Sequence, residues 1–157
     1  MNTLTTHTLL PLEQLALASA HETKERHRYR GLARRLRATA PEASRLMAEL
    51  GRECEQRLET LRDAARALGL SACLVIDDTE ASTSGKRQRL FSVDVALERQ
   101  ALKQTLESAD ASRRFFEWLL ETNATPELYR PLLACVAQKR AECRVLGERL
   151  AQSSLEA

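Results

Sequence analysis

The stretch from Leu12 to Leu36 carries a carboxylate where a helical bundle normally buries an apolar side chain. Read in heptads, one face of this stretch consists of Leu12, Leu15, Ser19, Glu22, Arg26, Tyr29, Ala33 and Leu36. Such a face is the a/d seam that packs inside a bundle, yet Glu22 and Arg26 are full charges. A buried charge is costly unless it is paired, hydrogen-bonded or bound to metal. The sequence therefore predicts that Glu22 meets a metal ion or an oppositely charged side chain inside the protein.

Similar residues recur in the second half of the chain. The two halves align with a constant offset of 85 residues, as expected of an internal repeat. Equivalent positions on this offset are Pro41 and Pro126, Glu42 and Glu127, Glu22 and Glu107, and Glu53 and Gln138. Polar side chains therefore stand at matching places in two similar halves.

Four helices are expected to position these side chains. Apolar spacing and helix-breaking residues predict helices at about 11–38, 41–68, 92–121 and 126–151, within a single domain of residues 11–152. Residues 1–10 are expected to form an extended lead, and residues 153–157 a short tail. Short turns precede Pro41 and Pro126, whereas a long crossover spans about residues 70–91. Within it, residues 71–76 are expected to lie extended against a hydrophobic surface. One long crossover in a four-helix bundle is ferritin-like connectivity.

Across about residues 11–151 the chain resembles the ferritin-like superfamily, most closely its rubrerythrin-like branch. Glu22 and an aromatic residue seven positions later, in the run Tyr29-Arg30-Gly31-Leu32-Ala33, carry this resemblance. It implies an all-α four-helix bundle with one long crossover between helices 2 and 3. It also implies two metal ions, held by a Glu on the first and third helices and a Glu-x-x-His on the second and fourth.

The ligand set that the resemblance implies is incomplete in this sequence. Glu22, Glu53 and Glu107 match three of the carboxylates, whereas Gln56 replaces a His and Gln138 replaces the last Glu. The remaining donors are oxygen atoms, which suit a hard divalent ion better than a redox di-iron centre. We expect no cofactor; the alternative is a divalent metal (Fe or Mn) at these five residues.

Arginine side chains offer a replacement for the missing metal cations. Arg26 and Arg57 each lie one turn after a candidate ligand, and Arg114 lies seven residues beyond Glu107. A guanidinium binds a carboxylate through two hydrogen bonds and keeps its proton in the interior. We expect Arg26, helped by Arg57 or Arg114, to form a core salt-bridge network. The alternative is that Arg26 and Arg57 extend outward to solvent.

Other surface features indicate the kind of partner. His27, Arg30, Arg34 and Arg37 form a basic stripe, but no aromatic residue interleaves it and the net charge is only +2. A nucleic-acid partner is therefore not expected. Phe115, Phe116 and Trp118 are interpreted as core or dimer contacts, and the protein is expected to be a homodimer with a further protein partner open.

Cysteine usage and hydropathy indicate the compartment. Cys54, Cys73, Cys135 and Cys143 form no CxxC pair, which favours reduced thiols and a cytoplasmic location. No apolar run approaches the roughly 18 to 20 residues of a membrane span, so none is expected.

These observations favour a ferritin-like bundle with a degenerate di-iron site that acts as a non-catalytic scaffold or interaction module. The alternative is a metal-binding relative, an oxidoreductase or peroxidase, that uses the remaining carboxylates. A binder of nucleic acid or anionic surfaces, using the basic stripe, is the weaker third class. No phosphate loop or nucleophile elbow points to hydrolytic or phosphoryl-transfer chemistry.

Overall fold

The computed structural model describes residues 8–74 and 95–155, and these residues are almost entirely helical. The elements in chain order are α1 (Pro11–Leu36), α2 (Pro41–Ala67), the short 3-10 helix η1 (Ser71–Cys73), α3 (Val95–Glu121) and α4 (Pro126–Leu155). The predicted all-α class is confirmed. Within the described ranges, none of the helices combines the length and the apolar character needed to cross a membrane.

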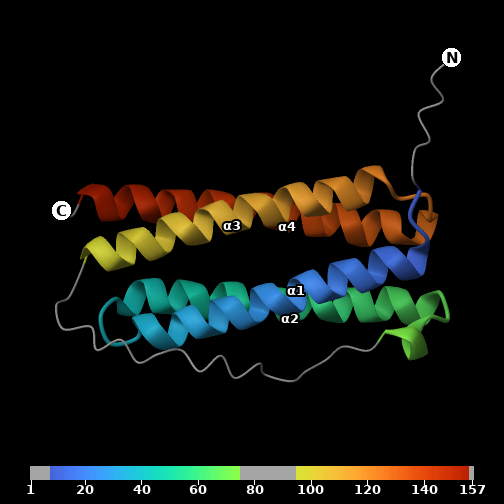
Figure 1. Cartoon of the computed structure of the whole chain (residues 1–157), viewed down its shortest axis with the longest axis horizontal. Helices are drawn as coiled ribbons and strands as arrows, with labels where there is room; N and C mark the ends of the chain where they lie inside the picture. The colour runs from blue at the N-terminus through green and yellow to red at the C-terminus, as the bar shows by residue number, and fades with distance from the viewer. Residues whose placement is uncertain (1–7, 75–94, 156–157) are drawn as a thin grey trace, which may run out of the picture.

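The helices form two antiparallel hairpins, α1–α2 and α3–α4, which lie against each other along their length (Figure 1). In this view α2 and α3 run in the same direction, whereas α1 and α3 run in opposite directions. Residues 75–94 join the hairpins, so most of the crossover predicted for residues 70–91 lies outside the described residues. Most of the predicted lead of residues 1–10 does so too.

Proline and glycine set the helix boundaries close to the predicted ones. Pro11, Pro41 and Pro126 each open a helix, where the missing N–H has no intrahelical partner to lose. Gly69 follows α2 at a φ of 69°, a left-handed conformation that favours glycine. The N–H of Leu70 then donates to the carbonyl of Ala65 at 2.8 Å, which closes the helix in a Schellman-type turn.

Two segments differ from the prediction. The segment expected to be extended from residue 71 instead coils into η1, because the Leu74 N–H bonds back to the Ser71 carbonyl. This turn lets Leu70 and Leu74 pack against one apolar cluster while residues 71–73 stay exposed. In addition, α4 continues to Leu155 with Ser153 buried, so the helix extends past the start of the predicted tail.

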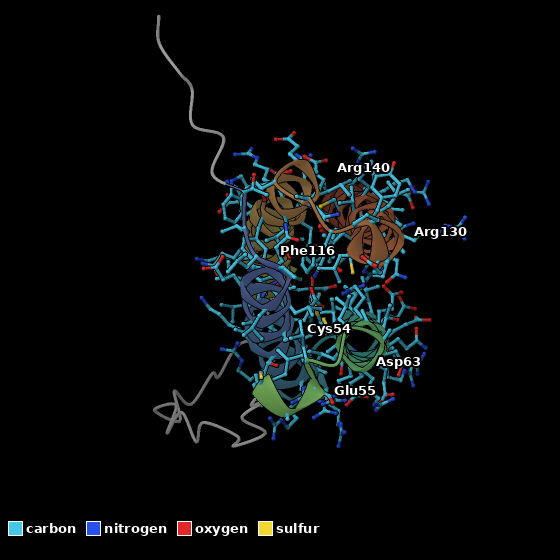
Figure 2. The ribbon with its side chains drawn as sticks, turned by 90° about the vertical axis from the view of Figure 1, so that its right-hand side faces the viewer. Cys54, Glu55, Asp63, Phe116, Arg130 and Arg140 are labelled. Atoms are coloured by element: carbon cyan, nitrogen blue, oxygen red, sulfur yellow. The ribbon has the colours of Figure 1, made fainter. Side chains whose placement is uncertain are left out.

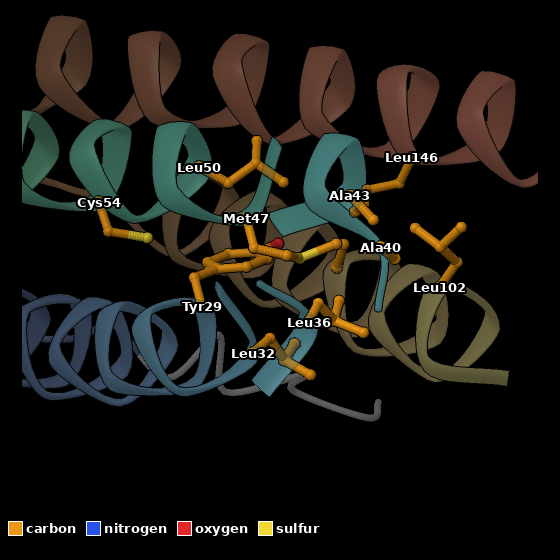
Figure 3. Packing of buried hydrophobic residues seen from close by; sticks show 11 residues of the cluster. Tyr29, Leu32, Leu36, Ala40, Ala43, Met47, Leu50, Cys54, Leu102 and Leu146 are labelled. Atoms are coloured by element: carbon orange, nitrogen blue, oxygen red, sulfur yellow. The ribbon is translucent and has the colours of Figure 1, made fainter. Parts of the chain in front are cut away.

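The interior contains two apolar clusters at opposite ends of the bundle. The first surrounds the α1–α2 turn and includes Leu36, Ala43 and Met47 (Figure 3). The second includes Leu15, Leu61 and Phe116. The charged side chains that the bundle buries most deeply lie between the two clusters, where the candidate site is found.

Candidate functional site

Four buried charged side chains form a network in the middle of the bundle. They are Glu22 on α1, Arg57 on α2, and Lys139 and Glu142 on α4, each no more than 1% exposed. Two carboxylates and two cations balance in charge, as burial requires. We call these four residues the buried ion network.

Direct contacts join the network across three helices. Arg57 donates from Nε to Glu22 Oε2 at 2.9 Å and from Nη2 to Glu142 Oε2 at 3.2 Å. Lys139 Nζ lies 2.7 Å from Glu22 Oε1 and 3.7 Å from Glu142 Oε2. Both oxygens of Glu22 therefore face a cation, and the network ties the α1–α2 hairpin to α4.

Neighbouring side chains complete the surroundings of the network. Tyr29 donates its hydroxyl to Glu142 Oε1, and Arg57 also donates to Gln138 Oε1 at 3.1 Å and Cys54 Sγ at 3.3 Å. The ammonium of Lys139 lies 5.6 Å from the centroid of the Phe116 ring on α3, a cation–π distance. Figure 2 shows Cys54 and Phe116 between the hairpins, while Arg130, Arg140 and Asp63 lie on the outside. All four helices therefore contribute to this layer.

Mutual pairing keeps Glu22, Arg57 and Lys139 ionised. Burial alone would raise the pKa of Glu22, but the charges of Lys139 and Arg57 outweigh it and hold that pKa below its ordinary value. Burial would likewise lower the pKa of Lys139, but Glu22 and Glu142 outweigh it, so that pKa is raised. The pKa of Arg57 is raised for the same reason. These three groups therefore hold fixed charges at neutral pH.

A tyrosine and two cysteines beside the network stay neutral. Burial raises the pKa of Tyr29 well above its ordinary value, and Glu142 adds to this. Burial also raises the pKa of the Cys54 thiol, and that of Cys135 to about 11, so neither is a thiolate at neutral pH.

His21 lies to one side of the network, where α1 faces α3. Its Nε2 is 2.8 Å from Ser112 Oγ, and its ring stacks on Phe115 with centroids 4.4 Å apart. Burial, and then the charge of Lys139, lower the pKa of His21 to about 4. The imidazole is therefore neutral at physiological pH.

The structure brings together only part of the predicted ligand set. Glu22 and Gln138 both contact Arg57, and Glu53 Oε2 lies 3.8 Å from Arg57 Nη1 with its side chain 41% exposed. Gln56 and Glu107 are exposed on the surface.

Glu107 is exposed because the core face of α3 follows a different register. That face is formed by Leu102, Thr105, Ala109, Ser112, Phe116 and Leu119. Along this face buried positions follow one another in steps of three and four residues, and position 107 is not one of them. The offset of 85 residues thus equates Glu107 with Glu22 in sequence but not in burial.

The buried donors do not fit a divalent metal ion. Mn, Mg and Ca take about six or more oxygen ligands, whereas both oxygens of Glu22 already face nitrogens that keep their protons. In residues 8–74 and 95–155, the His, Cys, Asp and Glu side chains form no group of three that could hold a metal ion. The donor set of this interior is thus that of an ion-pair network.

The three arginines predicted to pair in the core have different environments. Arg57 contacts Glu22 directly, so it is a member of the core salt-bridge network. Arg26 is buried and lines a hollow of about 470 Å³ between α1 and α2. Arg114 is not part of the network, because it pairs with Asp110 at 2.7 Å and its side chain is 73% exposed.

Sequence reasoning missed Lys139 and Glu142, although two signals were available. Both lie on the seam of α4 that continues through Leu128, Leu132, Cys135 and Leu146, at the heptad spacing used for α1. The offset of 85 residues also places Glu142 over Arg57, and these two residues pair in the structure. Applying the heptad reading used for α1 to the charged residues of all four helices would have identified Lys139 and Glu142 as buried charges.

The aromatic cluster predicted as core or dimer contacts is divided. Phe116 is fully buried and belongs to the core, whereas Trp118 is 44% exposed. Phe115 is partly buried, and its ring centroid lies 6.1 Å from that of Trp118.

Comparison with known proteins adds no assignment: the chain matches no family model, no curated protein and no solved structure.

Proposed function

We propose that this protein is a ferritin-like, rubrerythrin-like helical bundle with a degenerate di-iron site, and that it acts as a non-catalytic scaffold or interaction module. The observation that carries the proposal is the pairing of Glu22 with both Lys139 and Arg57. In a di-metal bundle, inward carboxylates are neutralised by metal ions. Here two protonated side chains supply that positive charge.

The protonation states of the network support a non-catalytic role. General acid–base catalysis works best with a group whose pKa lies near the operating pH. The pKa of Glu22 is lowered and those of Lys139, Arg57 and Tyr29 are raised, so each shift moves a group away from neutral pH. The network holds its protons in place and does not exchange them.

The position of the network supports a structural role. It joins α1 and α2 to α4, so sliding one hairpin past the other would separate buried charges. Leaving a buried charge unpaired costs about 3–5 kcal/mol. The network therefore specifies the register of the two hairpins.

The direction of the helices supports ferritin-like connectivity. α2 and α3 run in the same direction in Figure 1, and a chain that joins two such helices must cross the length of the bundle. A long crossover between the second and third helices meets this requirement.

A homodimer remains part of the proposal. Trp118 and the neighbouring Phe115 on α3 are the proposed contact, since a large exposed aromatic side chain favours an interface. Sedimentation equilibrium of the protein and of a Trp118→Lys variant tests this: a dimer that the substitution turns into a monomer is expected.

The main experiment measures metal content. The protein is purified without chelator from cells supplemented with iron and manganese, and metals are quantified per chain by mass spectrometry. We expect far less than one equivalent, and no rise in Tm on adding Fe(II) or Mn(II), since a ligand that binds only the folded state would raise it.

Two matched variants sharpen this test. Glu22→Gln should lower the Tm without changing metal content, and Glu107→Gln, at an exposed position, should change neither. One or two metal equivalents per chain that disappear in Glu22→Gln would contradict the proposal and favour the metal-dependent oxidoreductase or peroxidase.

A further inference from the structure

A groove between the start of α3 and the end of α4 is open among residues 8–74 and 95–155. One wall consists of Ala96, Arg99, Gln100 and Lys103, and the other of Gly147, Leu150, Ala151 and Ser154. Both sets follow the helical spacing i, i+3, i+4, i+7, so two straight stripes face each other. The groove has a volume of about 910 Å³ and runs for about 10 Å along each helix.

The α4 wall of the groove contains a glycine that neither backbone conformation nor crowding by the described residues requires. Gly147 has an ordinary helical backbone, and a Cβ built there would have no atom within 4 Å. Glycine inside a helix is less stable than alanine, because it loses more backbone freedom on folding. Ala151 and Ser154 continue the same stripe with small side chains. A surface of this kind lets another backbone approach closely from outside.

The rim of the groove is basic and lacks partners within the described chain. Arg99 and Lys103 are exposed and make no ion pair with any residue of 8–74 or 95–155, and neither does Arg144, one turn before Gly147. By contrast, the neighbouring Arg149 pairs with Glu42 and Glu98. Like charges at i and i+4, as in Arg99 and Lys103, repel each other and weaken a helix. An acidic partner would remove this repulsion.

We infer that this groove binds an acidic amphipathic helix of a partner protein, with its small apolar side chains over Gly147 and Ala151 and its carboxylates against Arg99 and Lys103. A helix fits because helix-in-groove recognition reads i, i+3, i+4 and i+7 positions, which is the spacing of both walls. This inference rests on the proposed function, because it names the surface and the partner chemistry of the interaction module.

The test uses the full chain and a displayed library of single amphipathic helices of about 20 residues. The library keeps an Ala/Leu stripe and randomises the outer positions among Glu, Gln and Lys. We expect selection to enrich Glu, and synthetic peptides of the selected sequences to bind at least about tenfold tighter than their Lys-substituted forms, as charge pairing at a rim requires. Fluorescence anisotropy measures these affinities.

Substitutions in the groove give the decisive comparison. Arg99→Glu combined with Lys103→Glu should reverse the preference from the Glu peptides to the Lys peptides. Gly147→Leu should weaken every peptide at least about tenfold, because its side chain would fill the groove. Gly31→Leu is the matched control, because Gly31 also lies inside a helix with no atom within 4 Å of a built Cβ but is not in the groove. It should leave binding unchanged, and circular dichroism confirms that all variants fold.

Three results would overturn this inference. The first is that the selection yields no binders, and the second is that Gly147→Leu does not weaken the binders it yields. The third is that the protein is a homodimer that Gly147→Leu dissociates, because a second copy would then occupy the groove. None of them depends on metal content, so this inference and the proposed function can fail separately.

Discussion

The same types of side chain form an ion network inside the bundle and another on its surface, around Glu117. Inside, Arg57 and Lys139 pair with Glu22 and Glu142 and are almost completely excluded from solvent. On the surface, Arg113 pairs with Asp110 at 2.7 Å and with Glu117 at 2.9 Å, and Arg140 joins α4 to α3 through Glu117 at 3.1 Å. The surface pairs have distances as short as those of the buried ones.

Burial makes the difference between the two networks. A surface ion pair is screened by water and salt, and either partner regains its hydration when the other is lost. A buried charge has no such alternative, so each member of the inner network depends on the others. Equal geometry therefore predicts unequal consequences of mutation, and three experiments test this comparison in order of expected effect.

Arg57→Met should cause the largest loss of stability. It leaves Glu22 and Glu142 buried with only Lys139 to neutralise them, and breaking a buried pair costs about 3–5 kcal/mol. Urea unfolding measures the loss. As a control, replacing all four network residues with apolar ones of similar volume should restore stability, because no charge remains unpaired. A cost below about 1 kcal/mol for Arg57→Met would show that the interior is hydrated.

The second experiment lowers the pH to protonate His21, which lies beside the buried ion network. The pKa of His21 is lowered to about 4 from 6.5, so between these values the unfolded chain binds a proton that the folded chain does not. Stability should therefore fall as the pH decreases from 6.5 to 4, by less than the roughly 3 kcal/mol of an unscreened shift because solvent reaches part of the ring, and the His21 contribution should level off above pH 6.5. Urea unfolding across this range measures the slope.

Substituting His21 tests whether this residue causes the slope. His21→Gln keeps a hydrogen-bonding group near Ser112 but removes the titration, so its slope should be smaller. Equal slopes in the wild type and His21→Gln would show that burial does not keep this imidazole neutral.

The surface network should give the smallest effect. Glu117→Gln removes the acid that both Arg113 and Arg140 contact, but all of these groups remain hydrated. We expect a loss at least about fivefold smaller than that of Arg57→Met, and one that disappears at about 1 M NaCl, whereas the Arg57→Met loss persists. Thermal unfolding at low and high salt measures both. A salt-independent loss in Glu117→Gln would remove the distinction between the two networks.

Local sequence signals determined the helices and one member of the site. Pro11, Pro41 and Pro126 start helices and Gly69 ends one, because their backbone preferences act within a few residues. The seam of α1 identified Glu22 as a buried charge that needs a partner. These conclusions depend on the order of residues along one helix only.

Only the tertiary structure decided which side chain is that partner. The choice among Arg26, Arg57, Arg114 and Lys139 depends on how far each helix is rotated and shifted against its neighbours. The same rotation buries Ser112 and Phe116 on α3 and exposes Glu107. A seam pattern shows that a position is buried but not what it faces, because partners on different helices are far apart in sequence. Packing of α1 on α2 brings Glu22 to Arg57, and packing of the two hairpins brings both to α4, where Lys139 contacts Glu22.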